Sequence, residues 1–143
     1  SIALGVALNS RNKKVFCLDG DGAFIMHMGA LTNIGNLKPS NYFHIVFNNG
    51  AHESVGKQPT LGFKINIPEI ALACGYKNAY TASTEKEIIS SLNLMMKSGG
   101  PSLLEIKVNL ESRDDLGRPT STTIQNKKDF MKYLLSNEAD SII

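Results

Sequence analysis

Two glycines flank an aspartate in Gly20-Asp21-Gly22, the segment of the sequence whose residues could do chemistry. Glycine lets a backbone turn tightly and approach a ligand closely. A helix that follows such a turn directs its first N–H groups at the ligand, which suits a phosphate. The Asp21 carboxylate would repel a phosphate unless a cation lay between them, and Mg²⁺ favours carboxylate and phosphate oxygens. The segment therefore indicates a diphosphate that is held through Mg²⁺.

A second candidate ligand group follows the next apolar run, where the sequence reads Asn48-Asn49-Gly50. An asparagine can supply the neutral oxygen that a Mg²⁺ site needs beside a carboxylate, and the loop beyond it offers backbone carbonyls. Two simpler interpretations remain, because Asp21 could serve only a turn and Asn48-Asn49-Gly50 could be a plain hairpin turn. The run before Asn48 does not alternate as a hairpin strand would, and the two segments together favour a metal site.

Two other phosphate-binding motifs are excluded by inspection. The dinucleotide fingerprint would require glycine at positions 20, 22 and 25, but position 25 is Ile25. The P-loop requires Gly-Lys followed by Ser or Thr, and the sequence contains no such tripeptide.

Strand and helix patterns alternate along the chain and predict an α/β domain with a mainly parallel sheet flanked by helices. Short continuous apolar runs are typical of strands that are buried on both faces of such a sheet. Ligands of these sheets bind beyond the carboxyl ends of the strands, where Asp21 and Asn48 are expected. The strands are expected at 15–18, 42–47, 79–82 and 103–108, and the helices at 1–8, 23–35, 67–74, 84–95 and 128–135.

Composition excludes several classes of protein. The chain has 143 residues, 42% of them hydrophobic and 20% charged, which suits one globular domain. A formal net charge of +2 is too small to argue for nucleic-acid binding, and no apolar run reaches the roughly 18 residues of a membrane span. Cys17 and Cys74 lie in apolar runs and are expected to be buried free thiols, consistent with a cytoplasmic location.

The spacing of the two candidate segments resembles the signature of thiamine-diphosphate-dependent enzymes. Gly-Asp-Gly is followed by 25 residues, Ala23 to Phe47, and then by Asn-Asn. Residues 48–60, which read NNGAHESVGKQPT, resemble the phosphonopyruvate decarboxylases, with the sulfopyruvate decarboxylase beta chains as close relatives. The resemblance extends from Ser1 to about residue 109, and the remaining tail is much less diagnostic.

The resemblance implies a thiamine-diphosphate-binding domain that uses thiamine diphosphate and Mg²⁺ as cofactors. It also implies a lyase that decarboxylates a 2-oxo acid, expected to be phosphonopyruvate, with sulfopyruvate as the alternative. It assigns Mg²⁺ to the side chains of Asp21 and Asn49 and the carbonyl of Ala51, and the diphosphate to Gly20, Gly22 and Ala23.

The same resemblance implies that another polypeptide segment completes the site. Members of the family carry an earlier strand and loop that touch the diphosphate, and a pyrimidine-binding domain whose glutamate activates the cofactor. Neither is recognisable in this sequence, which begins at Ser1 with no Met and no basic leader. We therefore expect a fragment or a separate subunit, inactive alone, within a homo-oligomer or hetero-oligomer.

The substrate anion would need a donor, because a phosphonate keeps its charge after the carboxylate is lost. His52, Ser54 and Lys57 follow the predicted metal turn and could supply one. Lys57 replaces the glycine that the family pattern leads us to expect, so His52 is the candidate catalytic residue. His27 and His44 are expected to be structural or to face a partner.

A non-catalytic module that binds a nucleotide or diphosphate is the alternative from a different class. The pairing of Asp21 with Asn49 distinguishes the two hypotheses, because a metal-free nucleotide site does not require it.

Overall fold

The computed structural model describes residues 1–111 and 115–136 of the chain. The chain divides into two compact units between Leu110 and Glu111. The first unit holds a parallel sheet with helices, and the helix of the second unit is α6 (Thr123–Leu135). No helix within the described residues is long and apolar enough to cross a membrane.

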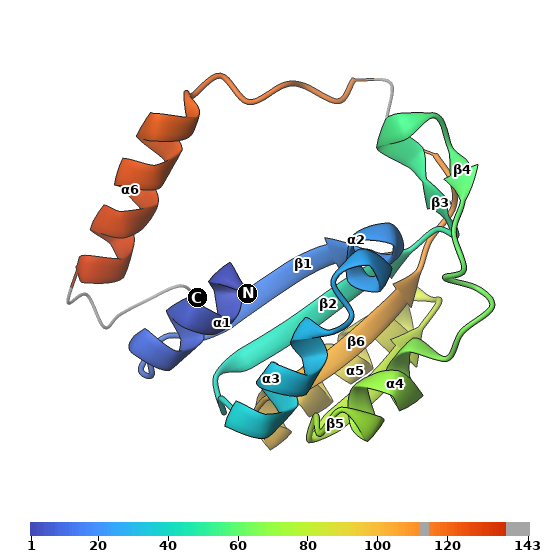
Figure 1. Ribbon diagram of the computed structural model, residues 1–143, viewed down its shortest axis with the longest axis horizontal. Coiled ribbons are helices and arrows are strands. Elements are labelled where there is room, and N and C mark those ends of the chain that lie inside the picture. The colour runs from blue at the N-terminus through green and yellow to red at the C-terminus, as the bar shows by residue number, and fades with distance from the viewer. Residues whose placement is uncertain (112–114, 137–143) are drawn as a thin grey trace. The chain divides into compact units, whose positions relative to one another are not determined.

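A four-stranded parallel sheet forms the centre of the first unit (Figure 1). Its strands follow the order β1-β2-β6-β5, and each neighbouring pair is parallel. The sheet confirms the predicted α/β class with a mainly parallel sheet. The strand bounds are β1 (Val15–Gly20), β2 (Tyr42–Asn48), β5 (Asn78–Ala82) and β6 (Ser102–Lys107).

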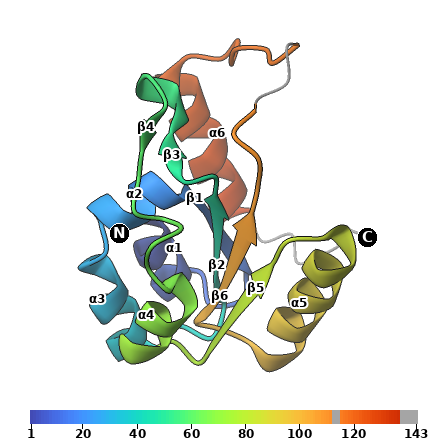
Figure 2. The ribbon, with the colours of Figure 1, turned by 90° about the vertical axis from the view of Figure 1, so that its right-hand side faces the viewer.

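Helices cover both faces of the sheet (Figure 2). Each face of the sheet carries a hydrophobic core, and side chains of β2 alternate between the two. Tyr42 and Val46 belong to the first core, and Phe43 and Ile45 belong to the second. The first core packs against four helices and the second against one. These are α1 (Ile2–Asn9), α2 (Asp21–Met26), α3 (Ala30–Leu37) and α4 (Ile67–Ala73) for the first core, and α5 (Glu85–Ser98) for the second.

The ends of two helices follow from local sequence as predicted. Thr84 caps α5, because its hydroxyl accepts from the Glu87 N–H at 3.3 Å while the Glu87 carboxylate accepts from the Thr84 N–H at 3.1 Å. Gly75 follows α4 with φ +100°, a conformation that glycine adopts without strain.

The expected helix over residues 23–35 is wrong in one respect, because the structure divides it into α2 and α3. Between them the chain tightens: the Ala30 N–H donates to the His27 carbonyl at 2.9 Å and the Leu31 N–H to Met28 at 3.0 Å. These bonds span three residues rather than four, so the continuous ladder of an α-helix is interrupted. The helix also begins at Asp21 rather than at residue 23.

Residues 48–66, expected to form a loop, contain a small antiparallel ribbon. Ala51 pairs with Pro59 and His52 with Gln58. Asn48-Asn49-Gly50 is therefore the link from β2 into this ribbon and not the turn of a plain hairpin. The elements of the ribbon are β3 (Ala51–His52), the short helix η1 (Glu53–Val55) and β4 (Gln58–Pro59).

Both cysteines are free, and both are half-buried rather than fully buried as expected. The second unit is described by itself. Helix α6 begins at a Thr122 cap, whose hydroxyl accepts from the Gln125 N–H at 3.1 Å, five residues before the expected start. None of its residues is buried.

Candidate functional site

The two candidate segments lie at the same edge of the sheet. Gly20, the last residue of β1, is in register with Phe47, so Asp21, which follows β1, and Asn48, the last residue of β2, lie at the ends of neighbouring strands. Gly20 is extended and precedes the first turn of α2, which contacts both β2 and β3. Figure 2 shows α2 and the β3–β4 ribbon beyond these strand ends. This is the edge at which the sequence predicts a ligand.

Asp21 is a buried carboxylate without a cationic partner. Its side chain is 1% exposed, and the Thr60 hydroxyl donates a hydrogen bond to its Oδ2 atom. Among the described residues, no lysine, arginine or histidine forms an ion pair with it. An ionised carboxylate is costly to bury unless a cation or several donors compensate it. A cation at this edge of the sheet would compensate an ionised Asp21.

Gly62 packs against Asp21 and Asn48 at a distance that only glycine allows. A Cβ atom at this position would lie 2.5 Å from Asp21 Oδ2 and 2.5 Å from Asn48 Oδ1. The Gly62 N–H also donates to the Thr60 hydroxyl at 3.0 Å. Residues 60–62 consequently lie directly over the Asp21 carboxylate.

Asn48 is a structural anchor. It is fully buried, and its Nδ2 donates to the Gly62 carbonyl at 2.8 Å and to Glu105 Oε1 at 2.7 Å. Its Oδ1 accepts from the Gly50 N–H at 3.1 Å. These three interactions hold the loop over the strand ends. Asn49, which is half-buried where Asn48 is fully buried, is the more accessible of the two to a ligand.

Asn49 is half-buried and is held by its own loop. Its Oδ1 accepts from the Ala51 N–H at 3.0 Å, and its Nδ2 donates to Glu53 Oε2 at 2.9 Å. The other oxygen of that carboxylate, Glu53 Oε1, is buried and has no hydrogen-bond partner in the described part of the chain. One oxygen of the Glu53 carboxylate beside Asn49 thus lacks a hydrogen-bond partner among the described residues.

His52 lies over the first turn of α2. A Cβ atom on Gly22 would fall 2.4 Å from His52 Nδ1, so any larger residue at position 22 would displace the imidazole. Gly20 has no comparable constraint, since a Cβ atom there meets nothing within 4 Å. The need for glycine at position 20 is therefore not explained by contacts within the described chain.

Lys57 has φ +58°, in the left-handed region that favours glycine. This geometry explains why a glycine was expected at that position. Ser54 and Lys57 are both exposed, whereas His52 is half-buried beside Gly22.

The structure thus brings together only some of the residues predicted from sequence. Asp21, Gly22 and His52 meet at the first turn of α2, and Asn49 and Ala51 share one turn. Sequence reasoning missed Thr60 and Gly62, which contact Asp21, and Glu105, which contacts Asn48. It expected Glu53 to be solvated or ion-paired, but Glu53 accepts from Asn49 and its Oε1 is buried. Glu105 had a signal, since it is a charged residue inside an apolar strand and is 4% exposed.

The donor set fits a hard divalent cation. The ligands predicted from sequence are the Asp21 carboxylate, the Asn49 amide oxygen and the Ala51 carbonyl, and oxygen ligands of this kind suit Mg²⁺. The observation that supports the fit is that buried Asp21 has no cationic partner among the residues that the structure describes.

A second polar cluster, Cys17–Asp19–His44–Tyr76, lies against the first core. His44 Nε2 is 2.9 Å from Asp19 Oδ2, and its Nδ1 is 3.2 Å from the Tyr76 hydroxyl. The Cys17 thiol lies 3.8 Å from the same Asp19 oxygen. The hydrogen bond from His44 holds the pKa of Asp19 below its ordinary value, and burial raises the pKa of the Cys17 thiol. His44 is structural here, as the sequence led us to expect.

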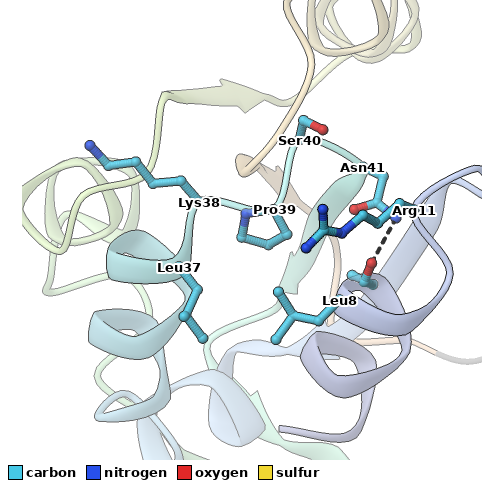
Figure 3. A pocket seen from close by; sticks show the side chains of 8 residues that line it. Leu8, Arg11, Leu37, Lys38, Pro39, Ser40 and Asn41 are labelled. Atoms are coloured by element: carbon cyan, nitrogen blue, oxygen red, sulfur yellow. Dashed lines mark hydrogen bonds between the residues drawn. The ribbon is translucent and has the colours of Figure 1, made fainter.

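A pocket of about 270 Å³ lies at the far end of the sheet, between the end of α1 and the turn into β2 (Figure 3). Arg11, Lys38 and Ser40 are among its lining residues. The side chain of Asn41, which also lines it, donates to the carbonyls of Ala7, Ser10 and Lys13, so it ties the two segments together. This pocket is remote from Asp21 and belongs to the packing of α1.

The parallel sheet with helices on both faces and polar residues at its strand ends defines an α/β ligand-binding domain. A solved structure of a known enzyme has a similar fold. The crystal structure of transketolase from Campylobacter jejuni matches with a TM-score of 0.59 at 22% identity, covering 73% of this chain and 18% of that chain. At that identity the likeness shows the fold.

The family described as "Thiamine pyrophosphate enzyme, C-terminal TPP binding domain" matches residues 1–106, and the chain belongs to this family. Phosphonopyruvate decarboxylase from Streptomyces viridochromogenes is 32% identical over 139 residues, covering 97% of this chain and 35% of the relative. Sulfopyruvate decarboxylase subunit beta from Methanocaldococcus jannaschii is 42% identical over 97 residues, covering 65% and 51%. The chain therefore spans about a third of the first relative and about half of the second.

Proposed function

We propose that this chain holds the diphosphate of thiamine diphosphate through Mg²⁺ in a 2-oxo-acid decarboxylase. One observation carries the proposal: in a chain of a thiamine-pyrophosphate-binding family, the buried carboxylate of Asp21 lies at the strand edge without a cationic partner in residues 1–111 and 115–136. Asp21 and Asn49 would hold the cation through side chains and Ala51 through its carbonyl. The diphosphate would lie along residues 20–23.

The protein and the cofactor have separate tasks in this reaction. Bound thiamine diphosphate supplies the electron sink that loss of CO₂ from a 2-oxo acid requires. This chain binds and orients the diphosphate end, and Thr60 and Gly62 cover Asp21 so that water is kept from its carboxylate. A pyrimidine-binding domain or subunit would supply the rest of the site.

The substrate we propose is phosphonopyruvate, which would be converted to phosphonoacetaldehyde and CO₂. The similarity to a phosphonopyruvate decarboxylase over 97% of this chain supports this assignment. His52 is our candidate for contact with the substrate anion, because it is half-buried over Gly22 and next to Ala51 in sequence. A protonated imidazole would be a charge-assisted donor to a phosphonate.

Sulfopyruvate is the second candidate substrate, favoured by the 42% identity to a sulfopyruvate decarboxylase beta subunit. A sulfonate needs the same donor and carries one negative charge fewer than a phosphonate. A non-catalytic diphosphate-binding module is the candidate from another class. A metal-free site of that class would not require the pairing of Asp21 with Asn49.

The test is the kcat/KM of the complete enzyme, this chain joined by the segment that completes its site, for phosphonopyruvate, sulfopyruvate and pyruvate. We expect phosphonopyruvate to have the highest value. A preference for sulfopyruvate would keep the mechanism and change the substrate, whereas a preference for pyruvate would exclude the anion role of His52. Absence of turnover with every 2-oxo acid would favour the binding module.

A further inference from the structure

Glu53 offers two carboxylate oxygens beside Asn49, and only one of them is used. Its Oε2 accepts from Asn49 Nδ2 at 2.9 Å, while its Oε1 is buried without a hydrogen-bond partner in the described residues. Within those residues Glu53 also lacks an ion pair. This is the one buried side-chain oxygen or nitrogen atom of the described chain that has no partner.

The used oxygen decides which way the Asn49 amide faces. The two ends of an asparagine amide have nearly the same shape, so their orientation is set by their hydrogen-bond partners. An ionised carboxylate only accepts, which places Nδ2 toward Glu53, and the Ala51 N–H only donates, which places Oδ1 on the other side. The hydrogen bonds to Glu53 and to Ala51 therefore require the same orientation of the Asn49 amide. They fix the position of Oδ1, the amide atom that can bind a cation.

The unused oxygen requires a donor that the described chain does not supply. A buried acceptor without a partner costs about 1–3 kcal/mol. Mg²⁺ is octahedral, so three ligands from this chain and at least one diphosphate oxygen leave at most about two positions for water, and such waters are hydrogen-bond donors. A bound cation at Asn49 would bring a donor to the neighbourhood of Glu53.

We infer that Glu53 is a positioning residue of the cation site: Oε2 fixes the Asn49 amide, and Oε1 accepts a hydrogen bond from a water of the bound Mg²⁺. The inference rests on the proposed function and adds to it a residue that binds the cation only through Asn49 and water. Mutation of a residue that hydrogen-bonds a metal ligand typically lowers the metal affinity by about tenfold to hundredfold.

The test measures the Kd of Mn²⁺ by electron paramagnetic resonance in the complete enzyme with saturating thiamine diphosphate. Mn²⁺ is the probe because it accepts the same oxygen ligands as Mg²⁺. Glu53→Gln keeps the size of the side chain and can still accept from Asn49, but it replaces one oxygen by a donor. Val55→Ala, an exposed position of the same short helix, is the matched control.

We expect the Kd of Mn²⁺ to rise about tenfold to hundredfold in Glu53→Gln and to stay at the wild-type value in Val55→Ala. The urea midpoint of the metal-free protein should not fall in Glu53→Gln, because the substitution removes a carboxylate oxygen that has no partner there. A wild-type Kd in Glu53→Gln would overturn the inference. So would a lower urea midpoint with the Kd unchanged, which would make Glu53 merely structural.

Asp21→Asn separates this inference from the proposed function. If Asp21→Asn abolishes Mn²⁺ binding while Glu53→Gln leaves it unchanged, only the role of Glu53 fails. If Asp21→Asn keeps the wild-type Kd, or the wild-type enzyme binds no Mn²⁺, the proposed cation site itself fails and the role of Glu53 falls with it.

Discussion

Asp19 and Asp21 are separated by a single residue at the end of β1, and they have opposite surroundings. The side chain of Asp19 is 34% exposed and lies 2.9 Å from His44. Asp21 is 1% exposed, and its side chain accepts a hydrogen bond from a neutral hydroxyl, that of Thr60. The more exposed carboxylate, Asp19, has a potential cation beside it, whereas the buried Asp21 has none in the described part of the chain.

The difference follows from where each residue lies relative to the strand. Asp19 belongs to β1, whose side chains reach across to β2, where His44 lies in register with Cys17. Asp21 begins α2 and faces the loop that returns over the strand ends. A polar group inside the sheet is satisfied by its neighbouring strand, whereas one beyond the strand end is left for a ligand. This contrast gives the predictions below.

The largest expected effect is complete loss of catalysis when the chain is alone. If Asp21 belongs to one half of a shared site, the purified chain should not turn over phosphonopyruvate, sulfopyruvate or pyruvate. Adding the pyrimidine-binding segment, in the same chain or as a second subunit, should restore decarboxylation. CO₂ release by the chain under multiple-turnover conditions checks this expectation, and sustained release without the added segment would contradict it.

Asn49→Leu should weaken Mg²⁺ binding in the complete enzyme, by more than about tenfold, because it removes an oxygen ligand. The loss should be smaller than in Asp21→Ala, since a neutral amide contributes less than a carboxylate to a Mg²⁺ site. Mg²⁺ titration with saturating thiamine diphosphate gives both values. An effect of Asn49→Leu larger than that of Asp21→Ala would reverse the assigned roles.

The two aspartates should differ in their effects on the stability of the metal-free protein. Asp19→Asn should lower the free energy of unfolding by about 1–3 kcal/mol, because it weakens a hydrogen bond that His44 makes in the core. Asp21→Asn should leave this free energy equal or raise it, since a buried unpaired charge is removed. Urea denaturation in the presence of a chelator measures both. Equal destabilisation by the two substitutions would remove the contrast between them.

The smallest expected effect concerns Glu87, a carboxylate that is satisfied without any cation. The backbone N–H groups of Ser83 and Thr84 donate to it and hold its pKa below the ordinary value. Its contribution to stability is therefore present above the unfolded pKa of about 4.3 and is lost as the pH falls through the folded pKa. Glu87→Gln should flatten this acid dependence slightly in urea midpoints measured between about pH 6 and pH 3. An unchanged pH profile would show that the cap contributes nothing.

Much of the framework could be predicted from the sequence because its signals are local. The strands are short apolar runs buried on both faces, and the spacing of Thr84 and Glu87 is that of a capping box at the start of α5. The candidate site could also be located, since Asp21 and Asn48 each follow such a run and parallel strands end at one edge.

The remainder depends on contacts that no local pattern encodes. The β3–β4 ribbon has strands of only two residues each, too short for an alternating pattern. Thr60 meets Asp21 across 39 positions, and Glu105 meets Asn48 across 57, so their roles emerge only when the chain is folded. The break between α2 and α3 could not be predicted from a proline, because residues 27–29 contain none.

The most direct test of the central claim is calorimetric titration of thiamine diphosphate into the complete enzyme, with Mg²⁺ and with a chelator in its place. The wild-type enzyme and Asp21→Ala should be compared, because Asp21 is the buried carboxylate to which we assign the cation. We predict binding by the wild-type enzyme only when Mg²⁺ is present, and no binding by Asp21→Ala in either condition. Equal affinity of the two proteins in Mg²⁺, or wild-type binding that is unchanged by the chelator, would contradict the account.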